Sequence, residues 1–372
     1  MNSRMFFLLI TFSLPAFGAL GITAVPTLEM PSGARQCGMG ETGVALADDQ
    51  NVLSWNPAGL GIHNDVLKGA ISMFGTSDVF NWRQRHYSLC YQFNKESLGG
   101  FCFDVNGLDY YVSNIDNYGR IISSNFASER VFSFGWGFNF SELGIKNHYF
   151  GVAVKFINSE DPVFFFPDQE PGRALVCDLG YIWNIIKPLN LGISLQNMGG
   201  AILYTGREDA NALPFMVNLG FSYKNSIPFN FMRPVDISAE FTMRRAFAHL
   251  TASGTGYRPD PFYKALITDW QDNSFSDNLR EILYSIGGEA VFLNSAAIRL
   301  GYFHDDLGKR QSFRYGIGGR FLNHCRIDFY QMPTVWGNEI YREVFVKKWG
   351  LEISLTNLLT WNKNDLRWWE QK

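Results

Sequence analysis

Several features that would point to an enzyme or to a helical membrane protein are missing from this sequence. After the N-terminal region, no apolar run reaches the roughly 20 residues that a membrane-spanning helix needs. The six histidines form no HExxH pair, and GxSxG, CxxC and phosphate-loop motifs are absent. We therefore expect neither catalysis nor a bound metal or cofactor. The net charge of −3 gives no electrostatic footprint for nucleic acid.

The first nineteen residues have the pattern of a secretion signal. Arg4 supplies a positive charge, Met5 to Phe17 is an apolar run, and small residues follow around Gly18. The alternative is a single membrane anchor, but the run is shorter than a spanning helix. We predict that residues 1–19 are a signal peptide and that the chain is exported.

Aromatic residues and glycine are abundant, whereas charges are few. Hydrophobic residues make up 46% and aromatics 16%, with 33 Phe, 16 Tyr, 10 Trp and 36 Gly, against 18% charged residues. An exported chain with this composition and no apolar helix is typical of a transmembrane β-barrel. The sequence therefore predicts an all-β protein of the bacterial outer membrane.

Apolar and polar residues alternate repeatedly after residue 65. In 214–224, for example, the apolar residues Val217 and Leu219 alternate with Asn218 and Gly220, which would lie on the opposite face of a strand. Fourteen segments show this pattern: 66–75, 85–94, 98–106, 131–140, 148–157, 174–184, 188–198, 214–224, 234–243, 283–293, 296–304, 312–321, 325–332 and 347–357. Most are close to the length of about 9–11 residues that a tilted spanning strand needs, and an even number is expected. We predict an antiparallel barrel of about 14 strands over residues 66–357.

The connections between these segments are alternately long and short. The connection 107–130 is long and 95–97 is short, and 244–282 precedes the two-residue connection 294–295. This predicts extracellular loops at one end and periplasmic turns at the other, with both termini in the periplasm. A soluble β-sandwich gives no reason for the alternation and would not place Phe and Trp along its solvent face. We expect the barrel to be a monomer.

Two of the five cysteines could meet across a turn. Cys90 and Cys102 fall opposite each other if the turn between them centres on Glu96. An oxidising periplasm would then allow a cross-strand disulfide. A register shift of one residue would instead leave two small side chains facing the lumen. The sequence leaves both readings open.

Inward-facing charges are concentrated in the strands after residue 233. The arginines among them are Arg299, Arg314, Arg320 and Arg326. One reading is a structural network of paired charges, because unpaired charges away from bulk water are costly. The other is a polar lumen wall of Arg299, Arg314 and Arg320 along a transport path, opposite an apolar wall. Such a lumen would suit a ligand with an acidic head and a hydrocarbon tail.

Two long connections carry apolar clusters. Asp260 and Pro261, followed by the sequence FYKALITDW, predict a helix start, and a second helical start lies near Ser276. The clustered residues are Phe164, Phe165, Phe166, Phe262, Leu266 and Trp270. They predict an apolar collar at the outer mouth. This collar would either anchor the barrel at the membrane interface, where aromatic side chains are favoured, or form an extracellular capture groove for a hydrophobic substrate.

Two further features have more than one interpretation. Gly99 and Gly100 begin the third segment and permit either a turn or a kink that opens the wall laterally. Residues 358–372 form a C-terminal tail with Trp368 and Trp369. This tail either lies at the membrane interface or extends the last strand.

The stretch from Ser32 to Gly61, SGARQCGMGETGVALADDQNVLSWNPAGLG, is too short for a domain and too glycine-rich for a strand or a stable helix. A compact segment attached to the start of a barrel is a candidate plug. Pro57 fixes φ and lacks a donor, and Asn56 can cap its own backbone. Gly38 and Gly40 allow the backbone to pass close to the lumen walls. We predict an N-terminal hatch over residues 20–65, in a lumen entered from the periplasmic end.

This stretch resembles the start of FadL-like outer-membrane long-chain fatty-acid transporters, and it is more similar still to poorly characterised relatives with a G-A-R-x-x-G-M-G, A-D-D and W-N-P-A-G-L signature. The matching residues are Gly33, Ala34, Arg35, Gly38, Met39, Gly40, Ala47, Asp48, Asp49, Trp55, Asn56, Pro57, Ala58, Gly59 and Leu60. The resemblance implies a fourteen-stranded barrel with an N-terminal hatch, in which Asn56, Pro57 and Ala58 match the hatch motif. It also implies capture of a hydrophobic substrate outside, a hatch that changes conformation, and lateral release through a kinked strand.

These observations lead to one main hypothesis and one alternative. The main hypothesis is uptake of long-chain fatty acids or similar hydrophobic compounds by a monomer surrounded by outer-membrane lipid, with no cofactor. The alternative is a non-transporting barrel in protein secretion or surface structure, because a branch with the same barrel type carries much the same N-terminal signature.

Overall fold

The computed structural model describes most of the chain between Thr23 and Thr356. The described residues are 23–62, 66–76, 82–93, 95–115, 121–160, 171–204, 210–229, 232–253, 256–271, 274–308, 310–321, 324–332, 335–336 and 348–356. Three expectations lie outside them: the signal peptide at 1–19, the cluster 164–166 and the tail 358–372.

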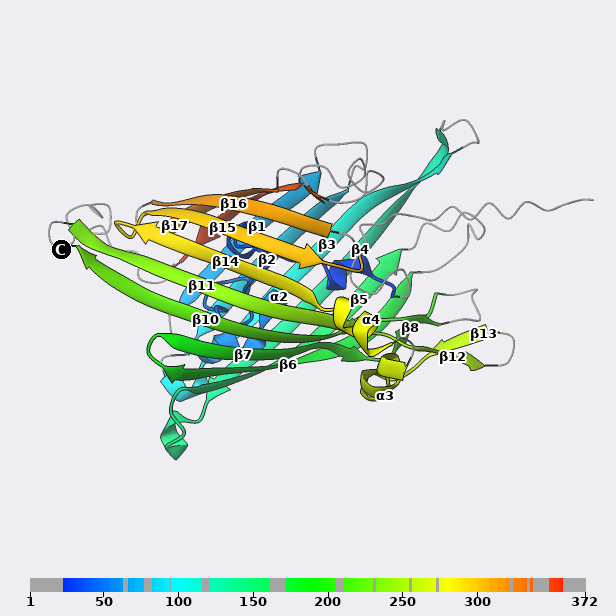
Figure 1. The fold of residues 1–372 in the computed structure, drawn as a ribbon, viewed down its shortest axis with the longest axis horizontal. Coiled ribbons are helices and arrows are strands. Elements are labelled where there is room, and N and C mark those ends of the chain that lie inside the picture. The colour runs from blue at the N-terminus through cyan, green and yellow to red at the C-terminus, as the bar shows by residue number, and fades with distance from the viewer. Residues whose placement is uncertain are drawn as a thin grey trace, which may run out of the picture.

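The described residues form a closed antiparallel β-barrel (Figure 1). The sheet has fifteen strands, of which the two-residue β18 (Val335–Trp336) pairs only with β16, so fourteen strands form the ring. The ring strands are β1 (Leu67–Thr76), β2 (Arg83–Gln92), β3 (Gly100–Ile115), β4 (Ile121–Asn139), β5 (His148–Glu160), β6 (Gly172–Ile186), β7 (Leu189–Gly199), β10 (Phe215–Phe229), β11 (Met232–Phe247), β14 (Leu283–Phe292), β15 (Ala296–Asp305), β16 (Arg310–Phe321), β17 (Cys325–Met332) and β19 (Lys348–Leu355). Pairing of β1 with β19 closes the ring. The predicted fold class is confirmed.

The strands lie where the alternation predicts them, but several are longer than expected. The connection 107–130, expected as a long loop, is mostly strand, because β3 and β4 remain paired up to Ile115 opposite Ile121. An antiparallel ladder is held by backbone hydrogen bonds, so it can continue past the apolar alternation. The periodicity of the sequence therefore marks the apolar part of each strand rather than its full length.

The two faces of the barrel wall have opposite character. Exposed apolar side chains on the outer face include Ile71, Leu89, Phe103, Phe134, Val154, Leu175, Phe221, Ile286, Leu300, Ile317 and Ile353. Buried polar side chains on the inner face include Ser72, Asp104, Ser133, Lys155, Asp178, Ser194, Asn218, Glu240, Arg299, Asp328 and Glu352. An apolar exterior around a polar interior is the arrangement of a barrel surrounded by lipid.

Residues 23–62 run through the lumen of this barrel. They contain four short helices among the described residues: η1 (Pro26–Leu28), α1 (Ala34–Gly38), α2 (Val52–Trp55) and η2 (Pro57–Gly61). Helix α1 contacts β15, β16, β17 and β19, whereas η2 contacts β3, β4, β5 and β6. These two groups of strands lie on different sides of the ring. We call residues 23–30 the strap and residues 31–62 the plug; the blue helices in Figure 1 lie inside the ring of strands.

The chain crosses the lumen once before the first strand begins. Thr23 forms a bridge with Ala212, which belongs to a long connection, so the strap lies at the long-loop end. Strand β1 begins opposite Tyr91, beside a short connection. Strand β19 ends at Leu355 opposite Cys325, also at the short-turn end. Both termini lie outside the described residues, so their predicted place in the periplasm stays a prediction; Thr23 itself lies at the long-loop end, because residues 23–62 cross the lumen before β1 begins.

The connections carry the remaining described elements. Those of the long connections are β8 (Ala201–Ile202), β9 (Asn211–Ala212), β12 (Leu250–Ser253), β13 (Gly256–Pro259), α3 (Phe262–Thr268), η5 (Asp269–Gln271) and α4 (Phe275–Arg280). Two short connections contain η3 (Glu96–Leu98) and η4 (Ser141–Leu143). Helix α3 follows Pro261 as the sequence predicts, and Ser274 caps α4 by accepting the N–H of Asp277. None of the helices in the described part of the chain is long and apolar enough to cross a membrane.

Candidate functional site

A carboxylate of the barrel wall binds the backbone of the plug. Glu240 on β11 accepts hydrogen bonds from the successive backbone N–H groups of residues 43–46, at donor–acceptor distances of 3.0, 2.7, 3.1 and 2.8 Å. Thr242 also donates its hydroxyl to Glu240, at 2.8 Å. Successive N–H groups that converge on one point form an anion-binding concavity, and bonds to a charged acceptor are strong. Local sequence gives no signal for this pairing, because its two partners are almost two hundred residues apart.

A second wall carboxylate, Glu352 on β19, holds another part of the plug. Its oxygens accept the backbone N–H of Ala34 at 2.9 Å, the side-chain amide of Gln50 at 2.5 Å and that of Asn51 at 3.2 Å. Ser72 on β1 also donates its hydroxyl to Glu352, at 3.0 Å. The plug is thus hydrogen-bonded to the wall at two separate buried carboxylates.

Arg35 links the plug to a third wall carboxylate. Its guanidinium lies 2.5 Å from Asp48 within the plug and 3.0 Å from Glu289 on β14. Burial opposes ionisation of Asp48, but Arg35 and Lys224 outweigh it and hold the pKa of Asp48 well below its usual range. Asp48 is therefore ionised at neutral pH. The ion pairs help to fix the turn of the plug that contains the matched A-D-D residues.

The predicted polar wall is mostly occupied by ion pairs. Arg299 is fully buried and lies 2.6 Å from Glu289 and 2.8 Å from Asp328. Arg314 lies 2.6 Å from Glu41 of the plug. Arg299 and Arg314 thus belong to a paired structural network, and a direct role for them in transport stays a prediction. Arg320 lies at the short-turn end and lines a cavity described below.

The predicted hatch motif lies against the opposite wall. The side-chain amide of Asn56 donates to the carbonyls of Val44, Tyr181 and Ile193, at 2.8, 3.2 and 3.2 Å, while its oxygen accepts the N–H of Ala58 at 3.1 Å. Asn56 thereby caps η2 and joins the plug to β6 and β7. Pro57 occupies the first turn of η2, where a missing N–H has no cost.

Glycines in both the plug and the wall permit this close packing. Gly40 adopts a φ of +77°, and a Cβ atom there would lie 2.8 Å from the backbone nitrogen of Tyr302. A Cβ atom at Gly38 would lie 3.2 Å from Gly316. On the wall, a Cβ atom at Gly180 would overlap the side chain of Asn56. The abundance of glycine thus includes inward positions at which plug and barrel backbones meet.

The wall at Gly99 and Gly100 is continuous in this structure. Gly99 has a φ of +58°, and Gly100 pairs with Gln92 on β2 and with Gly137 on β4. A lateral kink at these glycines stays a prediction.

An irregularity that the sequence reasoning missed lies between β6 and β7. The register shifts between Cys177 and Leu179, and Asn197 has a φ of +61°. Asp178 accepts the N–H of Asn197 at 2.7 Å and pairs with Lys155 at 2.7 Å. This is a β-bulge whose lost ladder bonds are replaced by buried charged side chains. The inward-facing charges Lys155 and Asp178 on neighbouring strands are the feature of the sequence that could have indicated this bulge.

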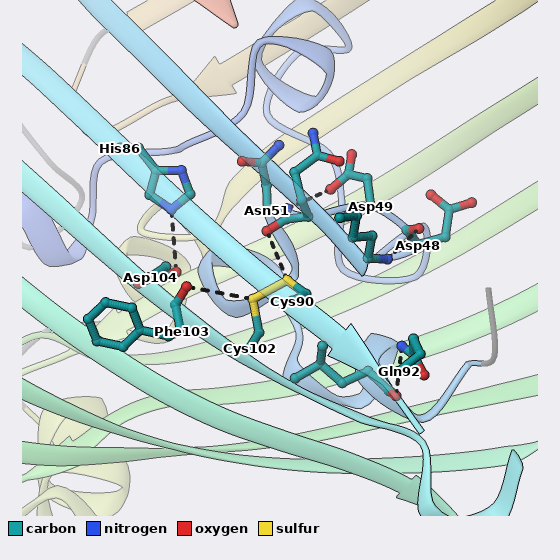
Figure 2. Close-up of a disulfide and its surroundings, with 12 residues drawn as sticks. Asp48, Asp49, Asn51, His86, Cys90, Gln92, Cys102, Phe103 and Asp104 are labelled. Carbon is teal, nitrogen blue, oxygen red and sulfur yellow. Dashed lines mark hydrogen bonds and ion pairs between the residues drawn. A yellow bond between two sulfur atoms is a disulfide. The ribbon is translucent and has the colours of Figure 1, made fainter. Parts of the chain in front are cut away.

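The two cysteines on β2 and β3 face the plug and are bonded. Cys90 lies opposite Cys102 in the register of the hairpin, and a disulfide joins them (Figure 2). The Sγ atom of Cys90 lies 3.6 Å from the carbonyl oxygen of Gln50 in the plug. Turn η3 begins at Glu96, near the expected centre of the turn. The disulfide reading of the sequence therefore agrees with the structure.

At the long-loop end of the lumen, apolar wall residues pack around the strap, and we call the space that the strap occupies between them the chamber. Its walls are Val131, Ile157, Val176, Ile202, Tyr204 and Leu213. Val25 of the strap belongs to this buried cluster, and Leu28 packs against it. Thr27 anchors the strap by donating its N–H and its hydroxyl to Glu129 on β4, at 3.0 and 2.5 Å. The sequence gives no sign of this chamber, because its wall residues come from separate strands and a loop.

The strap is held in an unfavourable conformation. Val25 has a φ of +62°, a region that β-branched residues rarely adopt. Burial raises the pKa of Glu29 to about 7, although a hydrogen bond from Thr23 and the charges of Arg310 and Arg244 oppose the shift. Backbone strain and a partly buried acid both lower the stability of the docked strap.

The described capture residues pack against the outer face of the barrel at its long-loop end. Phe262 packs on Phe215 with ring centroids 5.5 Å apart, and Trp270 packs near Phe247 at 6.3 Å. In β10 and β11, Phe215 and Phe247 are in the outward-facing set of residues, paired with each other. Leu266 is 41% exposed on the same helix as Phe262. Phe262 and Trp270 thus lie against the outer face of the wall at its long-loop end, and a capture groove at these residues stays a prediction.

The short-turn end of the lumen contains a charged cavity of about 300 Å³. Its lining includes Arg35, Asp48, Lys68, Lys224, Glu289, Arg320 and Arg326. The lumen thus changes from an apolar chamber at one end to a charged cavity at the other, with the plug between them.

Comparisons with known proteins identify the fold. No protein-family model and no curated protein matches the chain. The Pseudomonas putida toluene transporter TodX superposes with a TM-score of 0.52 at 12% identity, over 91% of this chain and 100% of that chain. The Ralstonia pickettii toluene transporter TbuX has a TM-score of 0.48 at 11% identity, over 87% and 97%. A Pseudomonas aeruginosa FadL homologue has a TM-score of 0.47 at 11% identity, over 88% and 98%. At these identities, the likeness to TodX shows a shared fold only.

Proposed function

We propose that this protein is an outer-membrane channel for the uptake of hydrophobic small molecules, such as long-chain fatty acids, and that it acts as a monomer. The observation that carries the proposal is the apolar chamber at the long-loop end, which the chain fills with its own strap. The fold shared with the toluene transporter TodX is consistent with this function. The apolar outer face of the barrel is consistent with an outer-membrane location.

The chamber selects ligands by their apolar surface. The wall side chains Val131, Ile157 and Val176 are nearly fully buried against the strap. A ligand that replaces Val25 and Leu28 must recover the same apolar burial, which is about 0.8 kcal/mol for each CH₂ group. The strain at Val25 and the burial of Glu29 make the docked strap less stable. They therefore reduce the free-energy cost of displacing it. A long alkyl chain or an aromatic hydrocarbon fits these requirements, whereas a sugar or an ion does not.

The plug would act as the hatch that closes the path below the chamber. The described residues of the plug are mostly buried against the wall, between the chamber and the charged cavity at the short-turn end. Passage therefore requires that the plug move, and Asn56, Pro57 and Ala58 would guide this movement because η2 is attached to β6 and β7 through Asn56. Gly38 and Gly40 would keep the moving backbone close to the wall.

The charged cavity disfavours axial release of an apolar compound. Its lining includes buried ion pairs such as Arg35 with Glu289, and an alkyl chain there would displace water without matching these charges. Lateral release into the membrane avoids this cost. The bulge between β6 and β7 and the pair Gly99 and Gly100 are the two candidate positions for such an opening.

Binding of a fluorescent fatty acid and of a neutral alkyl probe to the purified protein tests the proposal. Ile157→Asn places a polar group in the chamber and should weaken binding of both probes at least about tenfold. Phe156→Asn is a matched control, because its side chain is on the same strand but on the outer face. Resistance to denaturation in detergent shows that both variants fold.

Wild-type affinity of a folded Ile157→Asn variant would contradict the chamber assignment. Absence of binding to any apolar probe, together with a secreted protein that co-purifies, would instead favour the alternative role in secretion or surface structure.

A further inference from the structure

The helices α3 and α4 form a structured foot on the outer wall of the barrel. We call residues 262–271 and 274–280 the foot. Arg245 on β11 is paired with the outward-facing Val217, so its side chain leaves the barrel on the outside. There it bonds to Asp269 at 2.7 Å and to Glu281 at 2.6 Å, and its guanidinium lies 4.0 Å from the ring of Trp270. This buried outer arginine fixes the foot against the wall.

Helix α3 has three distinct faces. One face, with Phe262, Ala265 and the following Asp269, is turned to the barrel. A polar face carries Lys264 and Thr268, which both bond to Asp260. The third face is apolar and open, because Tyr263 and Ile267 are each 65% exposed and Leu266 is 41% exposed. On α4, Phe275 is 71% exposed and stacks near Trp270.

This open apolar face continues the apolar outer surface of the barrel. Along β10 and β11, the outward positions that follow the foot are Val217, Leu219, Phe221, Met243 and Phe241. Arg245 is the first charged outward residue beyond Met243 on β11. Charged and aromatic residues together mark the level at which the hydrocarbon region of a membrane gives way to its head groups.

We propose that the foot is a membrane-binding element that lies at the head-group boundary of the outer leaflet and turns Tyr263, Leu266 and Ile267 toward the lipid acyl chains. A helix with one apolar face and one charged face lies in the plane of a membrane interface in this way. The occupant is the lipid itself, because the face is continuous with the lipid-covered wall. The foot thereby holds the long connection between β11 and β14 down against the membrane.

A bound small molecule explains the exposed face less well than lipid does. The hollow between the foot and the wall, lined by Phe215, Phe247, Phe262 and Ala265, has a volume of only about 10 Å³. This is enough for about one water molecule. The exposed side chains themselves lie on the convex side of a single helix, which provides no enclosure. This inference does not depend on the proposed transport function.

Spin labels on the two open faces of α3 test the inference in full-length protein. The exposed Cys177 and the partly exposed Cys325 are first replaced by serine. Labels are then attached at Ile267→Cys and, as the matched control, at Lys264→Cys on the polar face. A label at Leu175→Cys, on the exposed outer face of β6, provides the reference for a lipid environment. The protein is placed in vesicles of phosphatidylethanolamine and phosphatidylglycerol, and collisions with oxygen and with a water-soluble nickel complex are measured.

The expected result is that the label at 267 collides more often with oxygen than with nickel, as at 175, whereas the label at 264 shows the reverse. A label at 267 that is as accessible to nickel as the one at 264 would overturn the inference. Shielding of the 267 label only after an apolar probe is added would also overturn it, in favour of the capture groove.

Discussion

Replacement of Glu240 by glutamine should loosen the plug while leaving the barrel folded. The substitution keeps the size and shape of the side chain, and the ladder of β11 does not depend on it. It removes the negative charge that accepts the N–H groups of residues 43–46. The effect is therefore expected in the plug and not in the wall.

The geometry gives the size of the effect. One oxygen of Glu240 accepts the N–H groups of Gly43, Val44 and Ala45, and the other accepts that of Leu46. A glutamine can keep its single carbonyl oxygen toward the first three, but it then turns an amide donor toward Leu46. Hydrogen bonds to a charged group contribute about 1.5–3 kcal/mol each. Loss of one bond and weakening of the others should cost about 3 kcal/mol, which corresponds to an opening equilibrium about 100-fold larger.

Hydrogen exchange measured by mass spectrometry is the suitable assay. Amides of residues 43–46 should exchange about 100-fold faster in Glu240→Gln than in the unmodified protein, while the amides of the barrel strands keep their rates. Glu142→Gln is the control, because Glu142 is exposed and its partners, Lys95 at 2.8 Å and Ser97 at 2.7 Å, lie at the surface. An unchanged rate at residues 43–46 in a folded variant would refute the view that Glu240 anchors the plug.

Two further predictions concern the strap and the wall glycines. The pKa of Glu29 rises from 4.5 to about 7 in the docked strap, so docking is most stable below pH 4.5 and loses about 3 kcal/mol as the pH rises from 4.5 to 7. A neutral alkyl probe that displaces the strap should therefore bind more tightly at about pH 8 than at about pH 5, and Glu29→Gln should abolish this difference; a difference that persists in the variant would exclude Glu29 as its cause. Gly180→Ala places a Cβ atom against Asn56 and should raise the conductance measured in planar bilayers, whereas Gly288→Ala, whose Cβ atom meets only a carbonyl at 3.4 Å, should not. Equal conductance in the two variants would contradict the hatch proposal.

The barrel could be predicted from sequence because lipid imposes a local pattern. Phe132, Phe134 and Trp136 all point outward on β4, with Ser133 and Gly135 between them. Such alternation can be recognised in any short stretch of the sequence. The alternation of long and short connections then follows from the positions of the predicted strands. The register at Cys90 and Cys102 was also accessible, since a short connection centred on Glu96 relates them directly.

The contacts of the plug could not be predicted, because they depend on which strands face each other across the lumen. Nothing near Gly43 in the sequence indicates Glu240 as its partner. The side of the wall on which α3 lies could not be predicted either, since the spacing of its apolar residues does not show what they cover. The available signal was Arg245, a charge in the outward-facing set of β11, which requires a protein partner on the outside of the barrel.

The two sides of the plug differ in a way that indicates how it would move in the proposed channel. Toward β5 and β6, Leu53 and Leu60 are packed in an apolar cluster with Ala153 and Ile182. Toward β11, β14 and β19, the plug is held by hydrogen bonds and ion pairs, and Arg35 and Asp48 on this side already border the charged cavity. Water from this cavity can replace polar bonds at little net cost, whereas separation of the apolar cluster exposes carbon surface. The plug should therefore swing about η2, with residues 43–46 exchanging their amide hydrogens before residues 58–61; the reverse order would place the hinge on the opposite wall.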